Sequence, residues 1–478
     1  MPSDLVSRTE HYWEERILPT LTDYIRIPNV SPAFDPAWAE HGHMARAVEL
    51  ARRWCEAEKP RGARVRLENL PGRTPLLRID IPARGVPADD RRTVLVYGHL
   101  DKQPPFTGWD EGLGPWTPVR REGRLYGRGG ADDGYAVFAA LAAFRALEDE
   151  GRPHARAVVL IECSEESGSP DLGAHVDALG ESLGAVDLVV CLDAGCQDYE
   201  RLWLTTSLRG NLLAELRIEV LREGVHSGNA GGLIPSVTMV LRRLLDRIED
   251  PRDGRLVPST LRVEIPEDRR REAEALARNL TADEVRRSLP LLDGVRLLHE
   301  DPLALLLANT WEPALAVTGL DGFPSVREGG NVHLPAARVK LSFRLPPTLA
   351  VETATRALRE TLESAPPFGA RVAFLPLSVM PGWNAPPLGP SLERALDEAS
   401  RRHFGPSFRA MGMGGSIPFM NMLAERYPAA RYCVTGVLGP HSNAHGPNEF
   451  LDLPTAVRLT ASVADILAAY AQERPSRP

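Results

Sequence analysis

The chain has 478 residues, of which 43% are hydrophobic, so it is long enough to bury more than one hydrophobic core, and we expect two domains. Its 56 basic and 64 acidic residues give a formal net charge of -8 without a long run of either sign, which argues against nucleic acid and a membrane surface as partners. The N-terminus lacks a basic region followed by a continuous apolar stretch, and no segment has the apolar length of a membrane span, so we expect a soluble cytoplasmic protein.

The cysteine and serine patterns exclude the usual covalent nucleophiles. Five cysteines are few and odd in number, and two lie in apolar, strand-like runs, which is typical of reduced core thiols. Cys191 and Cys196 do not have the spacing of a CxxC site, and no serine lies in a GxSxG motif. If the chain is an enzyme, we therefore expect it to activate a different nucleophile.

The first two hundred residues alternate apolar, branched runs with segments of helical period. Strands are expected at 93–100, 155–167 and 185–195, and a helix at 135–150. Near-continuous apolar strands separated by helices are typical of a sheet that is covered on both faces. The predicted class is therefore α/β, with a mixed, largely parallel sheet.

The pattern changes at about residue 208, which indicates a second domain. Residues 212–223 alternate like a half-exposed strand and 234–250 have the period of an amphipathic helix. The segments that follow are expected to form inserted surface helices at 266–290, strands at 337–347 and 371–377, and a helix at 351–365.

The α/β pattern resumes after Pro381, with expected helices at 391–404 and 453–473 and a strand at 430–438. We therefore predict a discontinuous first domain, 1–207 and 382–478. A smaller α+β domain, 208–381, would be inserted into it.

Acids and imidazoles follow the predicted strands where the chain leaves the sheet, and ligands of α/β proteins gather at that edge. They are His99 and Asp101, Asp132 and Asp133, Glu165 and Glu166, Asp193, and His441 and His445 near the C-terminus. Each alone is more often a structural or solvated residue. Together, in apolar surroundings, these side chains would destabilise the fold unless each had a partner of opposite charge or a hydrogen-bond partner, and a bound metal ion supplies such a partner. Imidazole and carboxylate without cysteine suit zinc, with manganese or cobalt as alternatives.

In this order along the chain, GHLD, GRGGADDG, EESGS, LDAG and HGPNE resemble the motifs of a di-metal peptidase family. The family contains carnosinase-type dipeptidases, glutamate carboxypeptidases, aminoacylases, acetylornithine deacetylase and succinyl-diaminopimelate desuccinylase. The resemblance implies two divalent metal ions per chain, one bound by His99 and Asp193, the other by Glu166 and His445, with Asp132 bridging both. It further implies a cis peptide bond between Asp132 and Asp133, Glu165 as the general base and Asp101 as the carboxylate that holds His99.

The predicted second domain carries weaker resemblances. GVHSGNAGG (224–232) is similar to the family's HSG segment, which implies that His226 stabilises the oxyanion, often in the site of the other subunit of a dimer. FRLPP places Arg344 where relatives bind the substrate carboxylate, with Asn331 as a helper. GMGGSIP (412–418) resembles a substrate-binding loop, which implies Gly415 and Ser416. One departure is DDGY at 132–135, where dipeptidase relatives read DDKG.

The predicted function is hydrolysis of the amide bond of dipeptides or short peptides with a free C-terminal carboxylate. Glu165 would take a proton from a metal-bridged water, the resulting hydroxide would attack the carbonyl, and Glu165 would pass the proton to the leaving amine. Glu165 and Glu166 would divide the work, because neighbours on an extended chain face different partners. The alternatives are an N-acyl amino acid deacylase with the same site and a non-catalytic binding or dimerisation relative. The resemblance further implies that the first domain is catalytic and that 208–381 is a lid and dimerisation domain, so the expected assembly is a homodimer through that domain.

Overall fold

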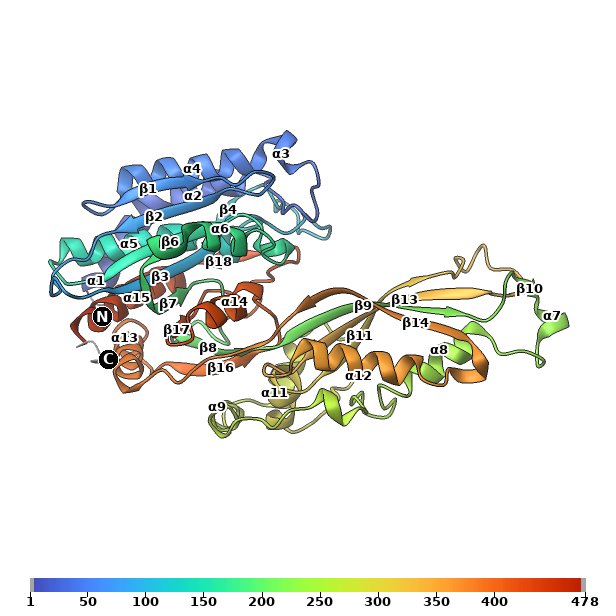
Figure 1. The fold of residues 1–478 in the computed structure, drawn as a ribbon. Helices are drawn as coiled ribbons and strands as arrows, with labels where there is room; N and C mark the ends of the chain where they lie inside the picture. Colours follow the sequence, from blue (N-terminus) through green and yellow to red (C-terminus); the bar gives the residue numbers. More distant parts are fainter. Residues whose placement is uncertain (1–3, 474–478) are drawn as a thin grey trace. The chain divides into compact units, whose positions relative to one another are not determined.

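The computed structural model describes residues 4–473 (Figure 1). The chain divides into two compact units: unit 1 comprises Met1–Thr205, Ala385–Ala410 and Met422–Pro478, and unit 2 comprises Thr206–Asn384 and Met411–Asn421. Residues 1–3 and 474–478 of the expected catalytic domain lie outside the described residues. Relative to the expected boundaries, the division falls at 205/206 and 384/385, and it groups Met411–Asn421 with unit 2.

Unit 1 is built on a six-stranded sheet with the strand order β1-β2-β6-β3-β7-β17. The strands are β1 (Arg64–Glu68), β2 (Leu76–Ile81), β3 (Arg92–His99), β6 (Arg156–Glu162), β7 (Ala185–Cys191) and β17 (Arg431–Val434). Neighbours from β6 to β17 are parallel, whereas β1 and β2 join antiparallel at one edge. The predicted α/β class with a mixed, largely parallel sheet is confirmed.

Helices bury both faces of this sheet. The helices of unit 1 are α1 (Asp4–Tyr12), α2 (Leu18–Ile25), α3 (Trp38–His41), α4 (His43–Glu58), α5 (Ala136–Asp149), α6 (Leu172–Leu179), α13 (Pro390–His403) and α15 (Leu453–Gln472), with a further helical stretch at Trp13–Ile17. Of these, α3 has no buried residue. Val94 and Val96 pack into the core cluster that contains residues of α5 and α15, while Leu95 and Tyr97, on the opposite face of the strand, are equally buried. This two-sided burial explains the continuous apolar runs of the sequence.

Strand β6 is shorter than the sequence suggested. We expected a strand through residue 167, but it ends at Glu162, and Glu165–Ser167 form a single helical turn. The carboxylate of Asp101 accepts the backbone N–H groups of both Glu165 and Glu166, which curls the chain around it. The two acids therefore diverge because of a turn and not because of an extended chain.

A small sheet in unit 1 joins distant segments near the end of the chain. It has the order β18-β5-β4 and consists of β18 (Phe450–Asp452), β5 (Arg124–Tyr126) and β4 (Val119–Arg121). The Asp452 side chain accepts the N–H of Thr455 and so caps α15, which has a proline in its first turn. Across residues 4–473, no helix is both long and apolar enough to span a bilayer.

Unit 2 contains an antiparallel sheet with the order β11-β13-β9-β14. The strands are β9 (Gly210–Glu219), β11 (Ala314–Asp321), β13 (Ala336–Leu345) and β14 (Arg371–Met380). Alternate residues of β13, including Val339, Leu341 and Phe343, pack into one core with α8 (Val237–Leu245) and α12 (Val351–Glu363). The sheet therefore has one face covered by helices, in line with its alternating pattern.

The remaining elements of unit 2 are short. They are a ribbon of β10 (Val225–His226) and β12 (Val332–His333), and the helices α7 (Ser227–Ala230), α9 (Glu267–Ala277), α10 (Ala282–Arg287) and α11 (Pro302–Thr310). Helices α9 and α10 occupy the predicted charged insertion. Strands β8 (Trp203–Leu208), β15 (Trp383–Asn384) and β16 (Arg409–Met413) and helix α14 (Pro418–Arg426) lie where the chain passes between the units.

Candidate metal centre and active site

The parallel strands of unit 1 bring the predicted metal ligands to one edge of the sheet. His99 is the last residue of β3, and its strand partner Glu162 is the last residue of β6. Asp193 follows β7, and Glu166 lies in the turn after β6. Because parallel strands have their carboxyl ends on the same edge, residues far apart in the sequence become neighbours there.

One group of possible ligands consists of His99, Asp132 and Asp193, whose donor atoms all lie within 4.8 Å of one another. Nε2 of His99 lies 3.3 Å from Oδ1 of Asp132 and 3.8 Å from Oδ2 of Asp193. All three residues are buried. This is the set that the resemblance implied for the first ion.

The second group consists of Asp132, Glu166 and His445, with donor atoms again within 4.8 Å. Nε2 of His445 lies 3.0 Å from Oδ2 of Asp132 and 3.3 Å from Oε2 of Glu166. Asp132 thus belongs to both groups and turns one oxygen toward each imidazole. The Asp132–Asp133 peptide bond is cis, as the resemblance implied.

The chemistry of this donor set fits divalent cations. Burial raises the pKa of Asp193 well above its ordinary value, and the neighbouring Asp133 and Asp132 raise it further. Burial, followed by the charge of Asp193, does the same to the pKa of Glu165. Crowded carboxylates in a poorly solvated place are stabilised when a cation lies between them. Imidazole and carboxylate donors suit zinc, manganese or cobalt.

Asp101 has a wider role than the sequence indicated. Nδ1 of His99 lies 3.1 Å from the backbone oxygen of Asp101 and 3.4 Å from its Oδ1. The same carboxylate accepts the N–H of Glu165 at 3.1 Å and that of Glu166 at 3.0 Å. The fully buried side chain of Asp101 therefore contacts the predicted base, Glu165, and one predicted ligand of each metal position, His99 and Glu166.

The predicted site residues of unit 2 form two pairs. His226 lies on β10 and Asn331 directly before β12, and the backbone oxygen of Asn331 accepts the N–H of Ser227. Nη1 of Arg344, on β13, donates to Oγ of Ser416 at 3.2 Å, and burial lowers the pKa of Arg344. A side chain at Gly415, the neighbour of Ser416, would meet open space.

The two pairs lie at opposite ends of the unit 2 sheet. Arg344 is paired with Asn211 near the start of β9, whereas Ala336 is paired with Glu219 at its end, beyond which the chain runs to His226. The eight residue-to-residue steps between these positions span roughly 26 Å at the rise of a β-strand. Figure 1 shows β10 and α7 beyond that far end of β9 and β13.

Several residues that the sequence analysis did not single out support the predicted ligands. Nε2 of Gln103 donates to Oε2 of Glu166 at 2.6 Å, and the hydroxyl of Tyr135 donates to the backbone oxygen of Leu192, next to Asp193. Gln103 stands two residues after Asp101, so its place in GHLDKQ was a usable signal. By contrast, His441 belongs to neither group of possible ligands among the described residues.

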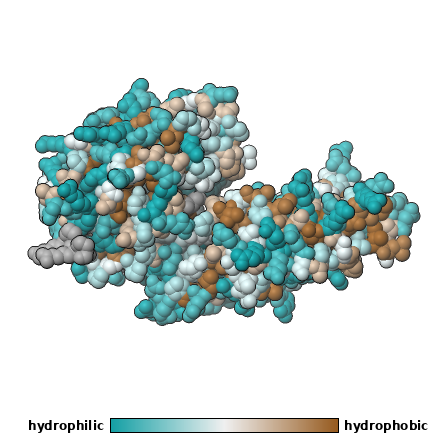
Figure 2. Space-filling view, in the orientation of Figure 1, coloured by the Kyte–Doolittle hydropathy of each residue, from teal (hydrophilic) through white to brown (hydrophobic). Residues whose placement is uncertain are grey.

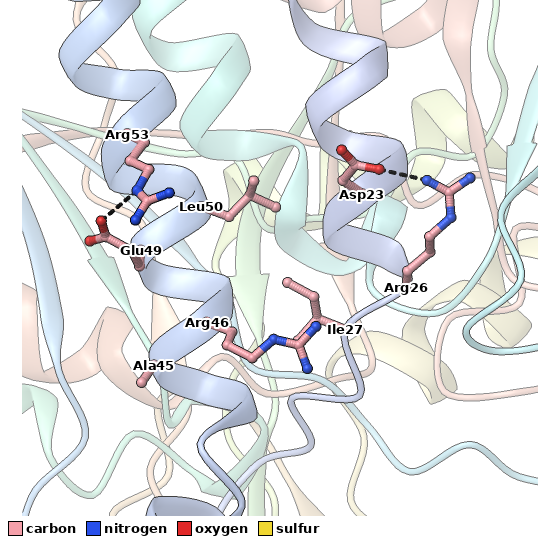
Figure 3. A pocket seen from close by; sticks show the side chains of 8 residues that line it. All are labelled: Asp23, Arg26, Ile27, Ala45, Arg46, Glu49, Leu50 and Arg53. Atoms are coloured by element: carbon pink, nitrogen blue, oxygen red, sulfur yellow. Dashed lines mark hydrogen bonds and ion pairs between the residues drawn. The ribbon is translucent and has the colours of Figure 1, made fainter.

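A surface pocket of unit 1 lies between α2 and α4, away from this chemistry (Figure 3). It is lined by Asp23, Arg26, Ile27, Ala45, Arg46, Glu49, Leu50 and Arg53. Arg26 pairs with Asp23 and Arg53 pairs with Glu49. None of the predicted site residues lines it.

The profile of Peptidase family M20/M25/M40 matches residues 95–469, which is more than half of the chain. The chain belongs to this family. A cysteinylglycine-S-conjugate dipeptidase of Corynebacterium striatum is 29% identical over 80% of this chain and 82% of its own length. A Beta-Ala-His dipeptidase of Homo sapiens is 28% identical over 70% of this chain and 66% of its own length. The predicted enzyme class, a metal-dependent hydrolase of the peptidase type, is confirmed, which sets aside the non-catalytic alternative.

Solved structures of the M20/M25/M40 family share the fold. The di-peptidase Dug1p from Saccharomyces cerevisiae has a TM-score of 0.79 at 22% identity and covers 100% of both chains. Human carnosine dipeptidase 1 has a TM-score of 0.78 at 22% identity and covers 99% of this chain and 100% of its own.

The departure DDGY has a physical reason in this chain. A Cβ atom at Gly134 would lie 2.2 Å from Cε1 of Tyr24 and 2.5 Å from the backbone oxygen of Gly129. Tyr24 is buried, and its hydroxyl donates to the backbone oxygen of Leu100 at 2.7 Å. Position 134 therefore has no room for the lysine of a DDKG motif.

Proposed function

We propose that the chain is a di-metal dipeptidase that hydrolyses dipeptides or short peptides with a free C-terminal carboxylate. The observation that carries the proposal is the pair of donor groups that share Asp132. His99 and Asp193 would hold one divalent ion, Glu166 and His445 the other, and Asp132 would bridge them. Zinc is the expected metal, with manganese or cobalt as alternatives.

Bound divalent ions would polarise the scissile carbonyl and lower the pKa of water, which is the chemistry that a two-metal site supplies. Glu165 would accept the proton of the attacking water and return it to the leaving amine. Its carboxylate suits a base because burial raises its pKa and it belongs to neither donor group. Asp101 would keep Glu165 in place through the backbone bond described above.

His226 would donate a hydrogen bond to the carbonyl oxygen as negative charge develops on it. Nδ1 of His226 accepts the N–H of Gly228 at 3.1 Å. In the neutral ring the proton is then on Nε2, which leaves a donor for the substrate. Arg344 would bind the substrate carboxylate with its planar guanidinium, and Gly415 and Ser416 would complete the pocket on the same chain. Asn331 lies with His226 at the other end of the sheet, so it would reach such a pocket only from the second copy of a dimer.

We also propose a homodimer through unit 2, and the separation of His226 and Arg344 supports it. A dipeptide is much shorter than the roughly 26 Å of strand between these ends of the sheet. If both residues act on one substrate, they come from different copies. The outer strand β11 supports such an assembly, since Val317 and Leu320 are 52% and 51% exposed, and Figure 2 shows hydrophobic side chains on the surface of this unit.

A cytoplasmic location is also proposed. All five cysteines are free and buried, as is usual for proteins of a reducing compartment. Neither nucleic acid nor a membrane is proposed as a partner, because the charge of the chain is mixed and moderately acidic.

The test is hydrolysis of a panel of dipeptides beside N-acetyl amino acids, with purified protein and added zinc or manganese. Elemental analysis of the same preparation should give about two ions per chain, as a two-metal site requires. Turnover of dipeptides supports the proposal. Turnover confined to the N-acetyl amino acids would show the deacylase alternative, and a protein that binds no metal after reconstitution would contradict both.

A further inference from the structure

The loop that carries His445 has little regular structure to hold it. Between β17 and β18, His441, Asn443, His445 and Asn448 all have positive φ angles, of 65°, 53°, 67° and 61°. The side chain of His445 is 56% exposed. A ligand on such a loop needs other contacts to keep its imidazole near the carboxylates of the second donor group.

A buried ion pair supplies these contacts. Nη1 of Arg128 donates to Oε2 of Glu449 at 2.6 Å, and the two side chains are 1% and 0% exposed. Arg128 stands four residues before Asp132, and Glu449 stands four residues after His445. The pairing of Tyr126 with Phe450 in the small sheet brings these two segments side by side.

Each partner of the pair also binds the backbone of the other's segment. Oε1 of Glu449 accepts the N–H of Gly129 at 2.9 Å and those of Ala131 and Asp132 at 3.4 Å. Nη2 of Arg128 donates to the backbone oxygen of Gly446, the residue after His445, at 2.7 Å. Its Nε donates to the backbone oxygen of Pro104, in the loop after Asp101, at 3.2 Å.

We propose that Arg128 and Glu449 are positioning residues that fix His445 against Asp132 and so set the affinity of the second metal position. The inference rests on the proposed function, because it requires that Asp132, Glu166 and His445 hold an ion. Polar partners behind metal ligands typically change metal affinity by about 10-fold to 100-fold when they are removed. The pair acts on the backbone of both ligand segments, so its loss affects the site without removing a ligand.

The experiment is calorimetric titration of metal-free protein with Zn²⁺, in the presence of a competing chelator. Glu449→Gln keeps the size of the side chain but removes the ion pair. Arg128→Lys keeps the charge but not the fork that reaches both Glu449 and Gly446. Both variants are expected to bind one of two Zn²⁺ ions about 10-fold to 100-fold more weakly than the wild type.

Asp465→Asn is the matched control, because Asp465 is also buried and pairs with Arg152 at 2.6 Å and Arg402 at 3.0 Å. It should lower the melting temperature but leave Zn²⁺ affinity within about twofold, because its ion pairs are with residues outside both ligand segments. Wild-type affinity in Glu449→Gln, or an equal loss in Asp465→Asn, would overturn the inference. If Glu449→Gln does not fold, Arg128→Lys decides by the same criterion. A wild-type protein that binds no Zn²⁺ would contradict the proposed function instead.

Discussion

Replacing Asp101 with asparagine tests how the two adjacent acids are held. The carboxylate of Asp101 accepts the N–H of Glu165 at 3.1 Å on one oxygen and the N–H of Glu166 at 3.0 Å on the other. Asp101→Asn keeps the shape of the side chain but turns an NH₂ group toward one of these donors. One buried N–H then loses its acceptor, and the imidazole of His99 loses the charge 3.4 Å from its Nδ1.

An unsatisfied buried N–H costs about 1–3 kcal/mol, so the free energy of unfolding of the metal-free variant should fall by that amount. A changed carboxylate behind a metal-binding histidine costs about 10-fold to 100-fold in activity. We therefore expect kcat/KM for a dipeptide to fall about 10-fold to 100-fold, which is about 1.4–2.7 kcal/mol of transition-state stabilisation. Denaturant unfolding and steady-state kinetics measure the two effects.

Asp90→Asn is the control, because it separates a site effect from general destabilisation. The side chain of Asp90 is almost fully buried and accepts the N–H of Arg92 at 3.0 Å, and the residue precedes β3 at the end opposite His99. It should lower stability and leave kcat/KM unchanged. If Asp101→Asn keeps wild-type kcat/KM, or if Asp90→Asn loses as much, the assigned role of Asp101 is wrong.

Three further predictions concern packing, substrate binding and pH. Gly134→Ala should lower the free energy of unfolding by about 1–3 kcal/mol or more, because the added Cβ would clash with the buried ring of Tyr24. A melting temperature equal to that of the wild type would refute this prediction. Arg344→Met should raise KM for dipeptides about 10-fold to 100-fold, because a hydrogen bond to a charged group contributes about 1.5–3 kcal/mol to binding. KM for dipeptide amides, which lack the carboxylate, should not change. An equal rise in KM for both substrates would exclude carboxylate recognition by Arg344. Burial lowers the pKa of His154 in the folded protein, so the unfolded state takes up a proton first as pH falls below about 6.5. The free energy of unfolding should therefore decline by at most about 1.4 kcal/mol per pH unit in that range. His154→Phe should remove that part of the decline in metal-free protein, and parallel pH profiles of the two proteins would contradict it.

Much of the core of unit 1 could be predicted from the sequence because its strands are buried on both faces. The apolar runs that became β3, β6 and β7 stand out for this reason, and the acids and imidazoles at their ends follow from the geometry of parallel strands. The strands β1 and β2 were not predicted, and neither was β11, whose residues are half-exposed and therefore lack a clear alternation.

The supporting contacts of the site could not be predicted, because they join residues far apart in the chain. Arg128 and Glu449 are separated by 321 residues, and no local pattern links them. The end of β6 could not be predicted for a similar reason, since the turn at Glu165 depends on the carboxylate of Asp101, which lies in the loop after β3. Sequence patterns therefore predict which residues carry the chemistry, and the fold adds the contacts that hold those residues.

The division of work between Glu165 and Glu166 is the central claim, and one comparison tests it most directly. Metal content and dipeptide turnover are measured on the same preparations of Glu165→Gln and Glu166→Gln. We expect Glu165→Gln to retain about two ions per chain and to lose turnover by about 100-fold or more, as for removal of a general base. Glu166→Gln should lose one of the two ions. Two variants that match in both metal content and rate would contradict the account.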